Sequence, residues 1–206
     1  MERKASSPQL TPEPVVRLNR NMNYTAVHYL NLFLGSGAIL LIVFSVIALF
    51  LLFIGPKKNS YLAFIDKHYL TLGFIVSLSA SLFSLVYSEI IGFAPCYLCW
   101  YQRVFTMPLP FIFGVAIWTK DRKIVKYVLP LLSVGFIVSV YQNFNYYFVD
   151  TGTLPCDASG VSCYQLLIQE FGGYIQIPTL ALSTFLALIT VVLVAHFYID
   201  ERGARG

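Results

Sequence analysis

Long apolar runs constrain this chain more than any other feature of its sequence. Five of them occupy residues 30–54, 69–88, 100–118, 127–148 and 177–198. About twenty apolar residues in a helix cross the hydrocarbon core of a bilayer, and a helix satisfies its own backbone hydrogen bonds there. Only 12% of the residues are charged, whereas ordinary soluble domains have about a quarter. We therefore expect an all-α integral membrane protein in a lipid bilayer.

The runs divide the chain into an extra first span and a unit of four spans. The charged stretch Asp66-Lys67-His68 is predicted to lie in a short loop before the second run, and Pro108 and Pro110 should kink the third span. In chain order we expect a flexible N-terminal tail (1–29), an additional transmembrane helix (30–55), a four-helix transmembrane bundle (61–199) and a cytoplasmic tail (200–206).

The distribution of Lys and Arg predicts the orientation of the spans. Basic residues cluster at 119–126 and after Arg202, and none lies between Lys126 and Arg202. Cytoplasmic loops carry an excess of Lys and Arg, so the 119–126 loop and the C-terminus are predicted to be cytoplasmic. The four basic residues of the tail 1–29 conflict with its outer placement in this topology. Because the basic residues form short clusters and no single exposed face, we expect no nucleic-acid partner.

A Cys-x-x-Cys motif opens the third span, in the segment that begins at Pro95. A helix that starts there places Cys96, Cys99, Gln102 and Arg103 on one face. A dithiol at a helix N-terminus is suited to redox chemistry or to metal ligation. Zinc would require a second close cysteine pair or histidines at ligand spacing, and neither accompanies this motif, so no metal site is expected.

A second cysteine pair, Cys156 and Cys163, lies in the loop before the last span, on the same predicted outer, oxidising side. One interpretation is a structural disulfide that staples this loop. The alternative is a relay, because two pairs on one side of a membrane can exchange a disulfide by thiolate attack. Arg103 likewise has two interpretations. It either extends to the lipid headgroups or, as a cation within a span, belongs to a functional site.

Taken together, these motifs resemble the disulfide bond formation protein B (DsbB) family, and more closely its short-loop BdbC-like members. The resemblance covers roughly residues 69–198. It rests on four features of the sequence: the Cys96–Cys99 motif with its preceding proline, Arg103 after it, the pair Cys156 and Cys163, and Ile177-Pro178 at the start of the last span. Gln142 stands in the span where family members often have a histidine.

The resemblance implies a membrane thiol:quinone oxidoreductase of the bacterial cytoplasmic membrane, with its cysteines on the extracytoplasmic side. It would reoxidise a thioredoxin-like, DsbA-type oxidase at Cys156 and Cys163. Cys163 would attack Cys96 and pass electrons to the Cys96/Cys99 pair. Cys99 would then donate to a membrane quinone, either ubiquinone or menaquinone. Arg103 and Gln142 are the residues expected to bind this quinone.

Two alternatives remain open. The vitamin K epoxide reductase-like family has a similar four-helix, quinone-linked plan, but its loop cysteines precede the Cys-x-x-Cys in sequence. A non-enzymatic membrane protein with two structural disulfides would have the same cysteines. The resemblance implies nothing for residues 1–60, and because both cysteine pairs lie beyond them we expect the extra span to be dispensable for the chemistry.

Overall fold

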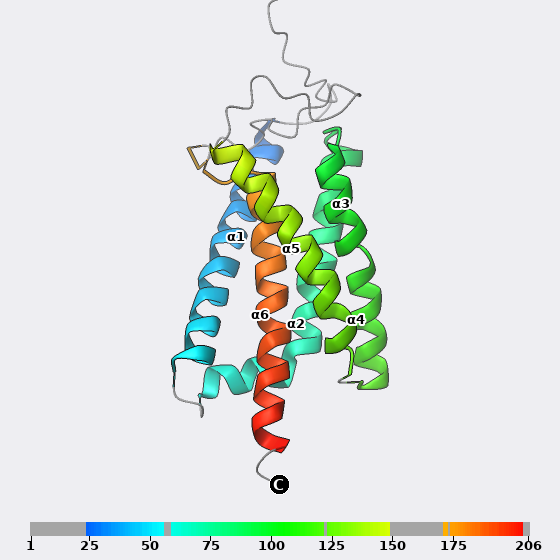
Figure 1. Cartoon of the computed structure of the whole chain (residues 1–206). Coiled ribbons are helices and arrows are strands. Elements are labelled where there is room, and N and C mark those ends of the chain that lie inside the picture. The colour runs from blue at the N-terminus through cyan, green and yellow to red at the C-terminus, as the bar shows by residue number, and fades with distance from the viewer. Residues whose placement is uncertain (1–23, 56–58, 122, 149–170, 173, 204–206) are drawn as a thin grey trace, which may run out of the picture.

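The apolar runs form long helices in the computed structural model of the chain (Figure 1). It describes residues 24–55, 59–121, 123–148, 171–172 and 174–203. Within these ranges the structure has no strand, and its elements in chain order are α1 (Tyr24–Phe53), α2 (Ser60–Leu85), the π-helical turn η1 (Val86–Ile90), α3 (Tyr97–Thr106), α4 (Pro108–Thr119), α5 (Val125–Phe148) and α6 (Ile177–Gly203).

Four helical segments of the described chain are each long and apolar enough to cross a membrane: α1, α2 with η1, α5 and α6. The fifth crossing consists of two short helices, α3 with 10 residues and α4 with 12. They follow each other along the bundle (Figure 1) and are separated at Met107. The break falls where Pro108 begins α4, because proline cannot donate the hydrogen bond that would continue α3. An all-α membrane bundle with an additional N-terminal helix is therefore confirmed.

Helix α2 begins earlier than predicted, and the predicted loop at Asp66-Lys67-His68 was wrong. These residues lie inside α2. Asn59 caps the helix by accepting a hydrogen bond from the backbone N–H of Tyr61 at 2.9 Å. Apolar side chains at helical spacing are buried on both sides of the charged stretch, and Asp66 itself is only 1% exposed. The helix continues through the charges because its buried face is continuous.

Two predicted tail boundaries also need correction. The predicted flexible tail 1–29 ends in helix, because α1 already begins at Tyr24, while residues 1–23 lie outside the described part of the chain. At the other end, α6 continues to Gly203, into the predicted tail 200–206. In both places the polar residues next to the apolar run still form helical turns. Polar residues therefore indicate the end of the apolar run, but the helix continues beyond it.

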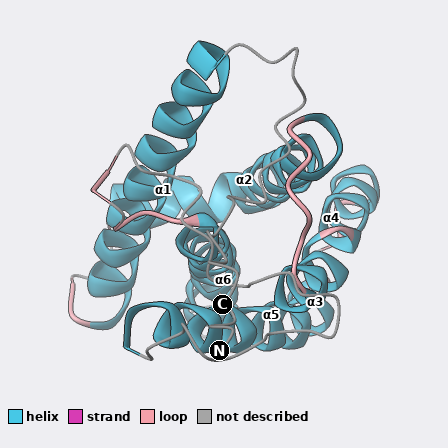
Figure 2. Ribbon diagram, turned by 90° about the horizontal axis from the view of Figure 1, so that it is seen from above, coloured by secondary structure: helices cyan, strands magenta, loops and turns pink. Residues whose placement is uncertain are grey.

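Helix α6 lies at the centre of the bundle and packs against α1, α2 and α5 (Figure 2). The main core joins α2, α4, α5 and α6 through buried apolar side chains that include Leu62, Ile65, Leu109, Phe113, Leu132, Phe185 and Leu188. At the closest approach of α2 to α4, a Cβ atom on Gly73 would lie 2.6 Å from the ring of Phe113. Small residues at such positions allow membrane helices to approach closely.

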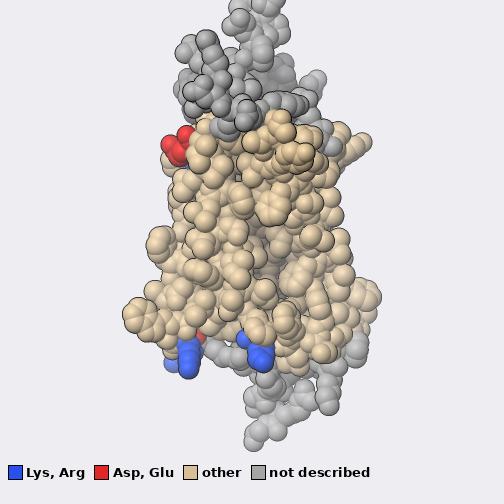
Figure 3. Space-filling model, turned by 180° about the vertical axis from the view of Figure 1, so that it is seen from behind, with Lys and Arg blue, Asp and Glu red and all other residues tan. Residues whose placement is uncertain are grey.

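The two ends of the bundle differ in charge. In the face shown by Figure 3, Lys and Arg side chains gather at the lower end, beneath a broad uncharged belt. Helices α1, α3 and α6 begin at the upper end, where α5 also ends (Figure 1). The start of α3, and with it the Cys-x-x-Cys motif, therefore lies at the end of the bundle opposite to the basic cluster.

Candidate functional site

The Cys-x-x-Cys motif is positioned by a reversal of the chain between η1 and α3. In η1 the backbone N–H of Ile91 donates to the carbonyl of Val86 at 3.0 Å, and the N–H of Phe93 donates to Tyr87 at 3.0 Å. A π-helical turn is an unusual element that is often found at functional sites. After this reversal Cys96 occupies the N-cap position of α3 with an extended backbone. The first cysteine therefore stands at the positive end of the α3 dipole.

Both thiols contact a glutamine from another helix. The Sγ atoms of Cys96 and Cys99 lie 3.1 Å apart, and Cys96 is only 3% exposed. The amide Nε2 of Gln142, in α5, donates to the two sulfurs at 3.7 Å and 3.8 Å. Its Oε1 accepts a hydrogen bond of 2.8 Å from Nε2 of Gln102. Gln142 is completely buried, so its amide is a fixed part of the dithiol's surroundings.

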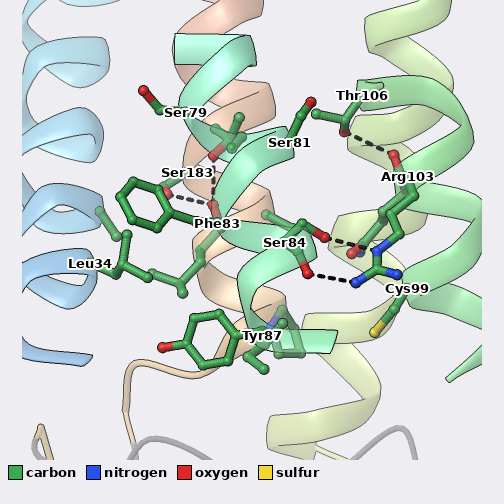
Figure 4. A pocket seen from close by; sticks show the side chains of 18 of the residues that line it. Leu34, Ser79, Ser81, Phe83, Ser84, Tyr87, Cys99, Arg103, Thr106 and Ser183 are labelled. Atoms are coloured by element: carbon green, nitrogen blue, oxygen red, sulfur yellow. Dashed lines mark hydrogen bonds between the residues drawn. The ribbon is translucent and has the colours of Figure 1, made fainter. Parts of the chain in front are cut away.

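Arg103 is buried and is bound to α2. It is 7% exposed, its Nε–H donates to Oγ of Ser84 at 2.8 Å, and its Nη2 donates to the Ser84 carbonyl at 2.6 Å. The guanidinium carbon lies 5.4 Å from the ring centroid of Trp100, within the range of a cation–π contact. Figure 4 shows the guanidinium of Arg103 directed at Ser84, with Cys99 projecting nearby from α3. This geometry does not fit an arginine extended to the headgroups.

These residues line one cavity of about 600 Å³. Cys96, Cys99, Arg103 and Gln142 all contribute to its wall. Further polar lining comes from α2, η1, α3 and α6, namely Ser79, Ser81, Ser84, Tyr87, Ser88, Gln102, Thr106, Ser183 and Thr184. The Oγ of Ser81 is buried and has no hydrogen-bond partner among the described residues. A buried hydroxyl without a partner is costly and marks a place where a ligand atom can bind.

The structure thus brings together four of the six predicted site residues. The other two, Cys156 and Cys163, lie outside the described residues. Sequence reasoning missed Ser84 and Ser81, whose only signal was the presence of serines within an apolar span. It also placed Gln102 on the motif's face without assigning it a partner, because the distance from α3 to α5 cannot be read from sequence spacing.

A comparison with protein-family models supports an assignment for this chain. Residues 66–195 match the model described as disulfide bond formation protein DsbB. The chain belongs to the DsbB family. The match includes the Cys-x-x-Cys motif, Arg103 and Gln142, and leaves α1 outside. DsbB membership supports a role in disulfide formation, and hence an oxidoreductase. It also decides between the two families weighed from the sequence, in favour of DsbB over the vitamin K epoxide reductase-like one.

Curated relatives carry names that agree with this DsbB assignment. "Disulfide bond formation protein C" of Bacillus subtilis (strain 168) is 41% identical over 122 residues, which cover 59% of this chain and 87% of the relative. "Probable disulfide formation protein C 2" of Bacillus anthracis is 37% identical over 128 residues, 62% of this chain and 90% of the relative. "Probable disulfide formation protein" of Coxiella burnetii (strain RSA 493 / Nine Mile phase I) is 34% identical over 143 residues, 68% and 95%. No solved structure matches this DsbB-family chain.

Proposed function

We propose that this protein is a thiol:quinone oxidoreductase that reoxidises a thioredoxin-like, DsbA-type oxidase. The observation that carries the proposal is that both motif thiols, Arg103 and Gln142 line a single cavity within the membrane-spanning bundle. A dithiol beside a buried cation and a cavity for a ligand is an arrangement suited to electron transfer from thiols to a membrane-soluble acceptor. A purely structural disulfide would need none of these neighbours.

The residues of the cavity fit a quinone. A quinone ring carries two carbonyl oxygens that accept hydrogen bonds. Donors on the cavity wall are Arg103 and the hydroxyl of Ser81, which has no partner in the part of the chain that the structure describes. The two hydrogen bonds from Arg103 to Ser84 use two of its five N–H groups. When bound, a quinone supplies the acceptor for two electrons and two protons. Ubiquinone and menaquinone both meet this description.

Disulfide exchange would bring the electrons to the cavity. A thiolate of the reduced partner attacks Cys156 and breaks its bond to Cys163, and the partner's second thiolate then resolves the mixed disulfide, so that the partner leaves oxidised. The thiolate of Cys163 attacks Cys96 and displaces Cys99. Attack by Cys156 on Cys163 re-forms the loop disulfide and releases Cys96. The first exchange moves two electrons from the partner to the loop pair, and the second moves them on to the Cys96/Cys99 pair, which is left as a dithiol.

Each residue of the site has a separate role in the proposed reaction. Cys99 is more accessible than Cys96 and would be the electron donor to a quinone held in the cavity, as Cys96 and Cys99 re-form their disulfide. Gln142 donates to both sulfurs and keeps them close to each other. Arg103, held by Ser84, would stabilise negative charge on an oxygen of a bound quinone as electrons arrive there, as preorganised donors do for an oxyanion.

The polarity of the bundle supports a proposed location for the reaction. The motif lies at the end opposite the basic cluster. If the basic end is cytoplasmic, as the positive-inside rule states, then the motif faces the extracytoplasmic side. We therefore assign the protein to a bacterial cytoplasmic membrane, with a secreted thioredoxin-like oxidase as its partner.

Trapping the redox state of the cysteines tests this proposal. The purified protein is incubated with a reduced thioredoxin-like partner, with and without quinone, and its thiols are alkylated and counted by mass. We expect the four cysteines to cycle and to return to the oxidised state only when quinone is present. If both pairs stay oxidised throughout, and no quinone is consumed, the protein is a membrane protein with two structural disulfides.

A further inference from the structure

Helix α1, which lies outside the family match, forms one wall of the cavity. Its lining residues include Phe33, Leu34, Gly37, Ala38, Leu41 and Phe44. They recur every three or four positions, so they form one stripe along the helix. The expectation that this span is dispensable for the chemistry took no account of this placement, because no sequence pattern indicated what the stripe faces.

A buried hydrogen bond attaches α1 to the reactive end of the bundle. The hydroxyl of Tyr87, in η1, donates to Oδ1 of Asn31, and the two residues are 6% and 3% exposed. Tyr87 also lines the cavity. Four residues before Tyr87, the ring of Phe83 in α2 lies 6.1 Å from that of Phe33 in α1. These contacts hold the stripe of α1 in register with the Cys-x-x-Cys side of the cavity.

The cavity is divided chemically between its helices. Every polar residue in its described lining comes from α2, η1, α3, α5 or α6, and every lining residue from α1 is apolar. Arg103 and Ser81 therefore lie on the polar side, and α1 supplies an apolar side. A ligand that fits both has a polar head and an apolar tail.

We propose that α1 is a binding wall for the prenyl tail of the quinone, whose ring lies at Cys99 and Arg103. This inference rests on the proposed function. The four-span unit of the family match would leave this side of the cavity facing lipid, whereas here a protein surface covers it. Along a fixed wall, part of the tail contacts protein in place of lipid chains. The area of this apolar contact grows with tail length. The wall makes affinity for quinone depend on the tail.

Gly37 offers a direct test because it lies in the middle of the stripe. A Cβ atom there would meet no heavy atom within 4 Å. The first atom of a larger side chain therefore meets no neighbouring helix, and Gly37 itself lines the cavity. Ile39 is the matched control, because it is 42% exposed on the same helix and does not line the cavity.

The experiment measures KM for quinones with no tail, a short tail and a long prenyl tail, using the full-length protein in vesicles of fixed lipid composition. In the unmodified protein we expect KM to fall as the tail lengthens. Gly37→Phe should raise KM for the long-tailed quinone by about fivefold or more, because the added ring occupies the space along α1 in which the tail would lie. Its KM for the tail-less quinone should stay within about twofold, and Ile39→Phe should change neither.

Two outcomes would overturn the inference. The first is that KM in the unmodified protein does not depend on tail length, as expected if lipid chains occupy the wall. The second is that Gly37→Phe folds but keeps the selectivity for tail length of the unmodified protein. If Gly37→Phe does not fold, Gly37→Leu takes its place with the same expected direction. Because the tail-less quinone reports the reaction at the thiols alone, failure of the wall is separate from failure of the proposed function, in which no quinone is reduced.

Discussion

Gln102 and Gln142 lie on different helices and share a buried hydrogen bond of 2.8 Å, in which Gln102 donates to Gln142. This bond uses the carbonyl oxygen of Gln142 and leaves its amide nitrogen directed at the two sulfurs, 3.7 Å and 3.8 Å away. The orientation of the amide beside the dithiol is thus determined by a residue of the same helix, α3, that carries the dithiol. The pair acts as a brace between α3 and α5 at the site.

Replacing Gln142 tests this brace. Gln142→Leu keeps the volume but removes the donor that faces the sulfurs, and it leaves the buried amide of Gln102 without its acceptor. We expect turnover of thiols to quinone to fall by roughly tenfold or more, since a hydrogen bond to a charged group contributes about 1.5–3 kcal/mol. Asn145→Ala is the control, because Asn145 is also buried in α5 and its hydrogen bond within the described chain goes to the carbonyl of Tyr141. Equal loss in both variants would indicate a general defect of α5.

Cys99→Ser should abolish quinone reduction, because the more accessible of the two thiols that line the cavity is lost. The loop pair Cys156 and Cys163 should still form a mixed disulfide with a thioredoxin-like partner. The measurements are the absorbance change of quinone and non-reducing electrophoresis of the trapped complex. Native-rate quinone reduction by purified Cys99→Ser would refute the assignment of the motif as the final electron donor.

Arg103→Ala should raise KM for quinone at least severalfold with little change in partner binding. The guanidinium supplies charge-assisted hydrogen bonds, which are about twice as strong as neutral ones. Arg103→Lys should rescue only part of the loss. The planar guanidinium bonds both Oγ and the backbone carbonyl of Ser84, and an ammonium group lacks this forked geometry. Steady-state kinetics over a range of quinone concentrations decides the point, and unchanged KM in the alanine variant would assign Arg103 a structural role only.

Ser84→Ala removes one of the two bonds that hold Arg103 and keeps the other, to the backbone carbonyl. Its effect should therefore be smaller than that of Arg103→Ala, a rise in KM for quinone of about two- to threefold with kcat nearly unchanged. Ser77→Ala serves as the control, because Ser77 is buried in the same helix and bonds only within it, to Gly73 and Phe74. A fall in kcat with constant KM would contradict a positioning role for Ser84.

Two glycines at the contact of α2 with α4 should respond differently to alanine. A Cβ on Gly73 would lie 2.6 Å from the ring of Phe113, whereas one on Gly114 would lie 3.5 Å from that of Phe74, an ordinary contact. We expect Gly73→Ala to destabilise the protein by about 1–3 kcal/mol and Gly114→Ala to leave the stability unchanged or increase it. Thermal unfolding in detergent measures both. Gly73→Ala combined with Phe113→Leu should regain stability, and no recovery would exclude overpacking as the cause.

The sequence was sufficient to predict the number of crossings and the composition of the motif's helix face. Both depend on local rules: apolar length sets a span, and the spacing of Cys96, Cys99, Gln102 and Arg103 sets a face. The start of α2 was mispredicted because charge was taken as a sign of a loop. Asp66 is nevertheless buried, since its neighbours at helical spacing continue the core.

The partners of the motif could not be predicted in the same way. Ser84 binds Arg103 from 19 residues away and Gln142 reaches Gln102 from 40 residues away. Such pairings depend on how the helices pack, and the sequence between two spans does not encode their rotation about their axes. The placement of α1 against the cavity is a further case, because an apolar stripe that faces a cavity looks the same in sequence as one that faces lipid.

The odd number of crossings also determines where the chain can be extended. Helix α1 begins at the end of the bundle where α3 begins, whereas α2 begins at the opposite end (Figure 1). A unit that started at α2 would have both of its ends on the basic side. With α1 in place, a domain fused ahead of Tyr24 emerges on the side of the cysteines. A thioredoxin-like oxidase tethered there by a short flexible linker would meet its electron acceptor at an effective concentration of about millimolar, so that delivery of substrate thiols would no longer depend on diffusion.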